Sequence, residues 1–281
     1  MSQTTRTVGG LDLSNLDGAT ERERAEFRAF YQRRMGHVHR GLTFLLDTRP
    51  DALKRFRLST MVGHDGPRPI GFGFVLDYAM AGYEVGVRYQ IGSLQAAGLD
   101  RAQCLDGIAI CALYCGPRGL ETIARALDDY AWIEPETPVR FPSHWTVDPS
   151  ALASGIDFTD SGLSEAELER IRAWYLRVMG QVPRYVDFLA AHEPEMLKVY
   201  RNRFETCLKV LPNQVLPATL IQYHATHGNL PGIREHLLLA RGLGMTKREV
   251  LHLVMAGTEY GGIEAISIVD EAAGDVFASW P

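Results

Sequence analysis

The apolar residues of this chain follow a helical rhythm along most of its length. Within residues 23–43, large apolar side chains recur at the three- and four-residue spacing of one helix face: Phe27, Phe30, Tyr31, Met35 and Val38. No convincing run alternates in the two-residue period of a strand. The pattern therefore predicts an all-α protein.

Four capping boxes mark where helices begin. In such a box a polar side chain accepts a hydrogen bond from the amide three residues later, and the later side chain bonds back to the first amide. The four pairs are Thr20 with Glu23, Asp100 with Gln103, Ser164 with Glu167, and Thr246 with Glu249. Two of them follow a glycine closely, so we expect a helix–glycine–cap–helix unit at Gly98 and again at Gly244.

The chain also repeats itself. At an offset of 144 residues, ten residues between 31 and 57 recur between 175 and 201: Tyr31, Arg33, Met35, Gly36, Phe44, Leu45, Pro50, Leu53, Lys54 and Arg57. At an offset of 146, five more recur after residue 227: Gly82, Gly86, Gly98, Tyr114 and Gly116. A fixed period with a two-residue slip indicates a tandem duplication. We expect repeats at residues 20–132 and 163–281 and a linker, residues 133–162, that packs across the surface of one half.

Composition narrows the class of protein. The chain has 281 residues, of which 46% are hydrophobic and 22% charged, as in an ordinary soluble globular protein. A net charge of −5 without a basic block argues against a nucleic-acid partner. No apolar run reaches the length of a membrane span, and the first residues lack the apolar core of a signal peptide. We therefore expect a cytoplasmic protein with no membrane partner and with reduced, buried cysteines.

The later part of each repeat has a recognisable order of residues. In the second repeat, His236, Ala240 and Gly244 are spaced H-x3-A-x3-G, and a cap and an apolar helix follow, ending in Tyr260-Gly261-Gly262. The first repeat ends the same helix in Tyr114-Cys115-Gly116. This order resembles the carboxymuconolactone decarboxylase family, which shares its fold with the alkyl hydroperoxidase D proteins.

The resemblance implies a fold and an assembly. It implies two tandem copies of an alkyl hydroperoxidase D-like helical domain, with a helical hairpin at the centre of each. Single-domain members of the family form trimers, or hexamers built from dimers. A fused pair would replace one dimer, so we expect a homo-oligomer, most simply a homotrimer.

The family's two known chemistries do not transfer directly. The peroxidase branch needs a C-x2-C pair whose second cysteine lies four residues before the histidine, and here those positions hold Asn229 and Gly232. The decarboxylase branch commonly has glutamate at the latter position. Glycine there is better explained by close packing or by room for a ligand. Cys111 and Cys115 share one helix face and leave thiol redox chemistry as an alternative.

Three histidines distinguish the second repeat. His224, His227 and His236 replace Tyr78, Ala81 and Gln90 of the first repeat. Imidazole titrates near neutral pH and suits proton transfer at a carbon or an enol. We therefore predict His236 as the catalytic base, assisted by His224 or His227.

Four neighbours complete the candidate site. We predict that Tyr260 stabilises a developing enolate by donating a hydrogen bond. Arg234 would bind a substrate carboxylate, and Glu235 and Tyr223 are the other candidate substrate-binding residues. Adjacent helix residues point about 100° apart, so Arg234, Glu235 and His236 cannot all face one pocket.

These residues predict a function and leave two alternatives besides thiol redox chemistry. The function is a cofactor-independent lyase, decarboxylase-like, or an isomerase that acts on a small carboxylated or carbonyl-bearing cyclic or dienol metabolite. One alternative is an enzyme in which His224, His227 and His236 bind a divalent metal. The other is a non-catalytic binding or assembly protein. In each case the second repeat is expected to be the active half and the first its structural partner.

Overall fold

A computed structural model describes residues 7–35, 38–59 and 70–281 of the chain. The prediction of an all-α protein is confirmed, because the described residues form α-helices, one 3-10 turn and one short β-hairpin whose two strands have two residues each. The sequence also predicts a loop at residues 63–73, which lies mostly outside the described residues, and the recurring Gly36 lies wholly outside them. No helix of the described chain has the length and apolar character that crossing a bilayer requires.

We call the part up to α7 the first half and the part from α8 the second half. The elements of the first half are β1 Thr7–Val8, β2 Leu11–Asp12, α1 Glu21–Met35, α2 Arg40–Thr48, α3 Pro50–Ser59, α4 Gly73–Met80, α5 Glu84–Ala96, α6 Arg101–Ala112 and α7 Gly116–Leu127. Those that follow are η1 Pro149–Leu152, α8 Glu165–Met179, α9 Arg184–His192, α10 Pro194–Thr206, α11 Val215–His227, α12 Leu230–Gly242, α13 Lys247–Gly261 and α14 Glu264–Ala278.

The helix bounds recur with the sequence offsets. Helices α8 and α9 begin and end 144 residues after α1 and α2, and α12 begins and ends 146 residues after α5. The four predicted capping boxes are formed, at Asp100, Ser164 and Thr246 and, through its bonds with Glu23, at Thr20. Each box satisfies amides that a helix start leaves free, so the helices begin where the sequence predicts.

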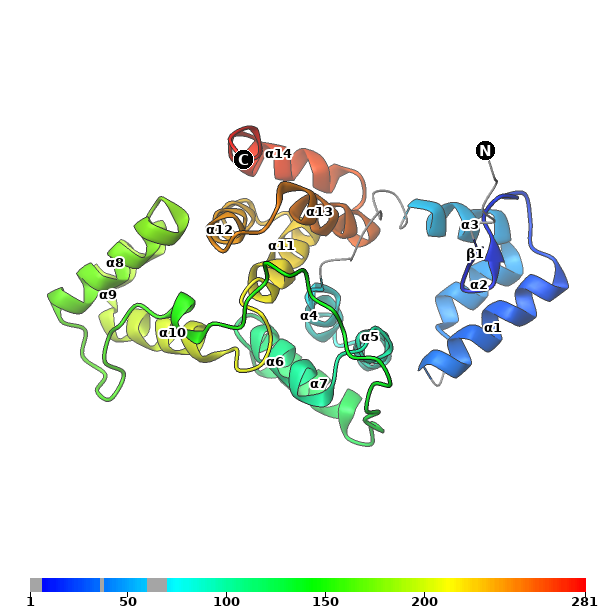
Figure 1. The fold of residues 1–281 in the computed structure, drawn as a ribbon, viewed down its shortest axis with the longest axis horizontal. Coiled ribbons are helices and arrows are strands. Elements are labelled where there is room, and N and C mark those ends of the chain that lie inside the picture. Colours follow the sequence, from blue (N-terminus) through cyan, green and yellow to red (C-terminus); the bar gives the residue numbers. More distant parts are fainter. Residues whose placement is uncertain (1–6, 36–37, 60–69) are drawn as a thin grey trace.

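The two halves meet at the centre of the molecule (Figure 1). Helices α4–α7 and α11–α14 pack together there, with α1–α3 at one end and α8–α10 at the other. Helices α4 and α11 join the halves closely, because a side chain at Gly73 would meet Gln222 at 2.6 Å. One hydrophobic core runs through α4–α14, whereas α1–α3 and the hairpin enclose a small core of their own.

The linker contacts both halves rather than one. At its start, Ile133 accepts a hydrogen bond from Gln95 Nε2 at 2.9 Å, in the first half. Further on, Trp145 Nε1 donates to Glu249 Oε1 at 3.1 Å, in the second half. These hydrogen bonds hold the proline-rich segment along the seam between the two halves.

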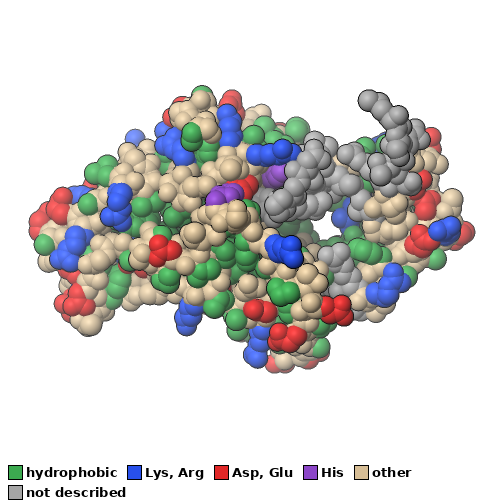
Figure 2. All heavy atoms as spheres, in the orientation of Figure 1, with side chains coloured by type: hydrophobic (Ala, Val, Ile, Leu, Met, Phe, Trp, Pro, Cys, Tyr) green, Lys and Arg blue, Asp and Glu red, His purple; other side chains and the backbone are tan. Residues whose placement is uncertain are grey.

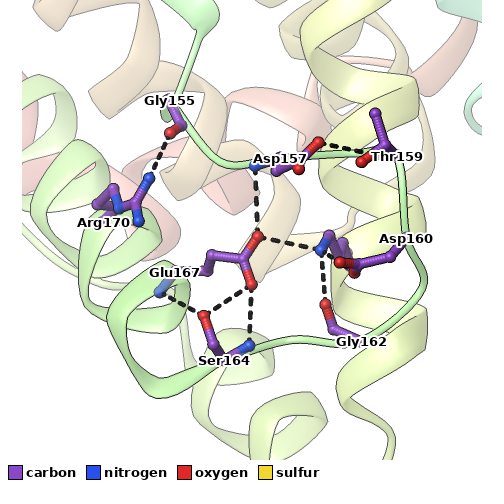
Figure 3. A network of polar contacts seen from close by, with 9 residues as sticks. Gly155, Asp157, Thr159, Asp160, Gly162, Ser164, Glu167 and Arg170 are labelled. Atoms are coloured by element: carbon purple, nitrogen blue, oxygen red, sulfur yellow. Dashed lines mark hydrogen bonds and ion pairs between the residues drawn. The ribbon is translucent and has the colours of Figure 1, made fainter.

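The last part of the linker carries a buried polar network (Figure 3). Lys198 is almost fully buried, and its Nζ donates to Glu167 Oε1 at 3.0 Å, Asp160 Oδ1 at 2.8 Å and the Gly162 carbonyl at 2.5 Å. Glu167 also accepts from the amide of Asp157 at 3.3 Å. All of Lys198's donors therefore have oxygen partners, as a buried ammonium requires.

The first half contains the same network. Lys54 pairs with Glu23 at 2.6 Å and donates to the carbonyl of Asn15 at 2.9 Å, while the amide of Asp12 donates to Glu23 at 3.0 Å. The segments that donate these amide hydrogen bonds also match in sequence, GLDLS at residues 10–14 and GIDFT at residues 155–159. The recurring contacts thus begin before residues 20 and 163, which the sequence comparison gave as the starts of the repeats.

Candidate functional site

Helices α11 and α12 form a hairpin that brings two histidines together. Gly228 ends α11 with a φ of 64°, and the side chain of Asn229 caps α12 by accepting from the Gly232 amide at 3.1 Å. The ring of His224 lies over Gly232, where an added Cβ would meet the ring at 2.7 Å. Gly232, which has no side chain, therefore makes room for an imidazole.

His236 is held as a neutral base. Its side chain is 5% exposed, and Nδ1 lies 2.8 Å from the carbonyl oxygen of Gly232. A carbonyl only accepts hydrogen bonds, so Nδ1 carries the proton and Nε2 keeps its lone pair as an acceptor. Burial lowers the pKa of His236 to about 4, although the bond to Gly232 opposes this change. At neutral pH the ring is therefore uncharged and Nε2 is able to accept a proton.

His224 lies beside His236 and has unused hydrogen-bonding groups. The ring centroids are 5.0 Å apart, and His224 is 2% exposed. Among the described residues, neither of its ring nitrogens has a hydrogen-bond partner. Burial, and then the nearby His236, lower the pKa of His224 to about 2. An unsatisfied buried polar group costs roughly 1–3 kcal/mol, so this arrangement is one that a ligand would stabilise.

The hydroxyl next to this pair comes from the other half of the chain. Tyr114, at the end of α6, places its oxygen 3.4 Å from His236 Nε2. The sequence assigned that role to Tyr260, but the Tyr260 hydroxyl instead bonds that of Tyr78 at 2.6 Å. Each half thus supplies its tyrosine to the opposite half, and the first half is more than a structural partner.

Because the halves exchange these tyrosines, the molecule contains two structurally equivalent sites that differ in their chemistry. In the first half, Tyr78 lies over Gly86 as His224 lies over Gly232, and Tyr260 covers it. Gln90 there replaces His236. The hydroxyls of Tyr78 and Tyr260 bond each other at this second place. Burial, and then this hydrogen bond, raise the pKa of Tyr260 above its ordinary value. The equivalent of His236 there is Gln90, whose amide cannot act as a base.

Tyrosine hydroxyls form a chain that leads away from His236. Tyr114 is hydrogen-bonded to Tyr200, and Tyr200 to Tyr185. The hydroxyls of Tyr185 and Tyr175 are 2.5 Å apart, and Arg201 Nη1 donates to Tyr175 at 3.2 Å. Sequence comparison could have drawn attention to two of these residues, because Tyr185 and Tyr200 replace Gly41 and Phe56 of the first half.

The two charged residues next to His236 have different surroundings. Glu235 is half-buried near the hydroxyls of Tyr114, Tyr185 and Tyr200, and burial raises its pKa to about 7. Arg234 instead makes a bidentate pair with Asp275 at 2.7 and 2.9 Å. The equivalent Arg88 pairs with Asp129, so the Arg234 pair is part of the repeated scaffold.

His227 does not join the other two histidines. Its Nε2 lies 2.9 Å from Oδ1 of Asp77 on α4, and Tyr223 lies between it and His224 with ring distances of 4.6 and 5.2 Å. Asp77 is buried, which raises its pKa to about 8, and its Oδ2 has no partner among the described residues. Burial also lowers the pKa of His227.

The geometry bears on the metal and thiol alternatives. Among the described residues, no group of three or more His, Cys, Asp or Glu side chains is placed to hold a metal ion. Cys111 and Cys115 are reduced and buried, and burial raises the pKa of both thiols. Since the thiolate is the reactive form, this environment disfavours redox chemistry at either cysteine.

Comparisons of the chain with protein-family models, with curated proteins and with solved structures returned no match. The assignment of the candidate site therefore rests on the geometry of its residues.

The burial of Asp77 predicts an unusual dependence of stability on pH. A carboxyl whose folded pKa is raised binds more protons in the folded chain, so it costs stability as pH rises from about 4 to about 8. Asp77→Asn removes this cost. We expect its Tm relative to the wild type to rise by about 4 °C between pH 4.5 and pH 8, measured by calorimetry.

Asp275→Asn is the matched control, and its Tm relative to the wild type should not rise between pH 4.5 and pH 8. Arg234 lowers the pKa of Asp275 to about 2, so its contribution to stability is present above pH 4 and is lost in acid. If Asp77→Asn instead loses stability at pH 8, Asp77 and His227 form a stabilising ion pair and the assignment is wrong.

Proposed function

We propose that this chain is a cofactor-independent enzyme that moves a proton by general acid–base catalysis at His236. The reaction would be that of a decarboxylase-like lyase or an isomerase on a small carboxylated or carbonyl-bearing cyclic or dienol metabolite. One observation carries the proposal: two buried, neutral imidazoles, His224 and His236, lie side by side, and among the described residues neither ring nitrogen of His224 has a hydrogen-bond partner. Such a pair lowers the stability of the fold and is suited to catalysis.

The surroundings of His236 support each step. Its Nε2 would remove a proton next to a carbonyl group, and the adjacent Tyr114 hydroxyl would stabilise the developing enolate. Tyr114 takes the role that the sequence gave to Tyr260. His224, whose ring nitrogens have no partner within the described part of the chain, is available to bind the substrate's polar groups.

The tyrosine chain gives the proton a route to solvent. As Tyr114 receives a proton from His236, it passes its own proton to Tyr200, and the transfer can continue to Tyr185. Burial raises the pKa of each of these tyrosines, so the hydroxyls relay protons without ionising. Glu235, with a pKa near 7, would exchange the proton with water at the end of the route.

We also propose that the chain is a tandem alkyl hydroperoxidase D-like protein of the carboxymuconolactone decarboxylase type. The recurrence of helix bounds, capping boxes and lysine networks in both halves supports this relationship. The proposal includes a cytoplasmic homo-oligomer, most simply a homotrimer, with a small-molecule substrate and no bound cofactor.

The protonation state of His236 tests the proposal before a substrate is known. In long-range ¹⁵N–¹H spectra of the full chain, we expect His236 to be neutral at pH 7, protonated on Nδ1, and to titrate only below pH 5. Exposed His192 is the internal reference in the same spectra. A proton on Nε2 at pH 7, or a charged ring, would remove the proposed base.

Substrates can then be sought by isotope exchange. The chain is incubated in D₂O with cyclic and dienol carboxylates and ketones, with a chelator present, and deuterium uptake at carbon is followed by NMR. Exchange that survives chelation fits the proposal. Exchange that is lost on chelation and restored by a divalent metal would instead establish the metal-dependent alternative.

A further inference from the structure

The first half contains a cavity that the proposed function does not use. It has a volume of about 1000 Å³ and lies between α1, α5 and residues 129–137. Figure 2 shows the molecule hollowed between the α1–α3 end and the remaining chain. None of the residues around His236 lines this cavity.

The equivalent space in the second half is filled by side chains. Gly92 and Ala131 line the cavity, and at the same offset the second half has Leu238 and Phe277. Leu238 is buried, and Phe277 stacks on the buried Trp280 with ring centroids 6.0 Å apart. The duplicated scaffold therefore has a packed core where the first half has an opening.

A second difference keeps the cavity open. In the second half, α8 lies directly against α12, because Gly242 has no side chain, and a Cβ there would overlap the carbonyl of Val178. The first half has Ala96 in place of Gly242. Its methyl group excludes the same close approach of α1 to α5, which agrees with the separate core of α1–α3.

The cavity walls combine apolar surface with two arginines. Val85, Tyr130 and Ile133 supply the apolar part. The guanidinium of Arg88 lies 5.6 Å from the Tyr130 ring centre and pairs with Asp129. The exposed Arg33 makes no ion pair with any described residue, so its charge is available to an anion.

The polar groups on the remaining wall restrict the ligand further. Gln95 is 7% exposed, donates from Nε2 to the linker and leaves Oε1 without a partner among the described residues. Glu134 and Glu136 also line the cavity. These two carboxylates disfavour multiply charged anions such as nucleotides, whereas a single negative charge can lie against Arg33.

We propose that this cavity is a second ligand site, for a small molecule with a flat apolar body and a single carboxylate or sulfonate group. The apolar body lies against Tyr130 and Ile133, and the anionic group pairs with Arg33. The site is independent of His236 and belongs to the first half alone, since side chains fill its counterpart.

Binding of 8-anilinonaphthalene-1-sulfonate to the full chain tests the proposal, because this probe has an apolar body and one sulfonate. We expect saturable fluorescence with one site per chain and competition by benzoate. Ala131→Phe, which introduces the second-half residue, should weaken binding at least tenfold. Arg33→Gln should weaken it severalfold and reduce its dependence on salt.

Two controls make the outcome decisive. Ala124→Phe places the same ring on the exposed face of α7, outside the cavity, and should bind the probe as the wild type does. His236→Gln should also bind normally, so failure of the proposed catalysis would leave this result intact. If Ala131→Phe, folded by circular dichroism, binds as the wild type does, the cavity is not the site.

Discussion

Replacing His236 with glutamine should reduce turnover of the substrate identified by isotope exchange by about 10²–10⁴-fold, the usual contribution of a general base. Glutamine has a similar length and is the residue that the first half has at this position, Gln90. Its amide can still contact Gly232 but cannot take a proton from carbon. The measurement is the rate of deuterium uptake at saturating substrate, with Tm as the check on folding.

The tyrosine exchange supplies a matched pair of controls. Tyr114→Phe removes the hydroxyl beside His236 and should lower the rate by about 10–10³-fold. Tyr260→Phe makes the same change at the equivalent place in the first half, where the partner is Tyr78, and should leave the rate within about twofold. Equal losses in the two variants, or full activity in His236→Gln, would contradict the assignment of the active half.

Arg201→Ala should lower the free energy of unfolding by about 3–5 kcal/mol, the cost of leaving a buried charge without its partner. Arg201 is fully buried, pairs with Glu205 at 2.7 Å and donates to the carbonyl of Leu152 at 2.9 Å. Its guanidinium also lies 4.4 Å from the ring centre of Trp174. Alanine removes these contacts and leaves the Glu205 carboxylate buried. Urea unfolding of the full chain measures the resulting change in the free energy of unfolding.

Arg172→Ala is the control for this prediction. Arg172 on α8 forms three ion pairs with carboxylates, all of them largely exposed. Because water screens such pairs, we expect a loss below about 1 kcal/mol. A comparable loss in the two variants would show that burial is not what makes Arg201 important.

Local sequence signals predicted much of this fold. Capping boxes need only residues three apart, so the pair Ser164 and Glu167 fixes the start of α8 without tertiary contacts. Local signals could not predict the network at Lys198, because two of its acceptor oxygens come from an irregular segment about 40 residues away. The short motif GIDFT could have indicated it, but five residues are too few to distinguish from chance within a linker.

The candidate site was predictable only in part. Helical spacing and the H-x3-A-x3-G motif identified His224 and His236, which the structure brings together. Spacing also placed His227 on the same helix face, yet it turns to Asp77, a residue 150 positions earlier. Comparison of the halves as separate units could not show that they exchange Tyr114 and Tyr260, since the exchange depends on how the halves pack.

The exchange of tyrosines also bears on how the chain is made. Tyr114 and His236 are 122 residues apart in sequence, and α4 is covered by α11, which begins at Val215. At 5–20 residues per second, a ribosome takes roughly 5–20 s to travel from the end of α7 to the end of α11. During that interval the face of α4 that packs on α11 lacks its partner helix. The nascent first half therefore exposes this face of α4 to solvent until α11 has been synthesised.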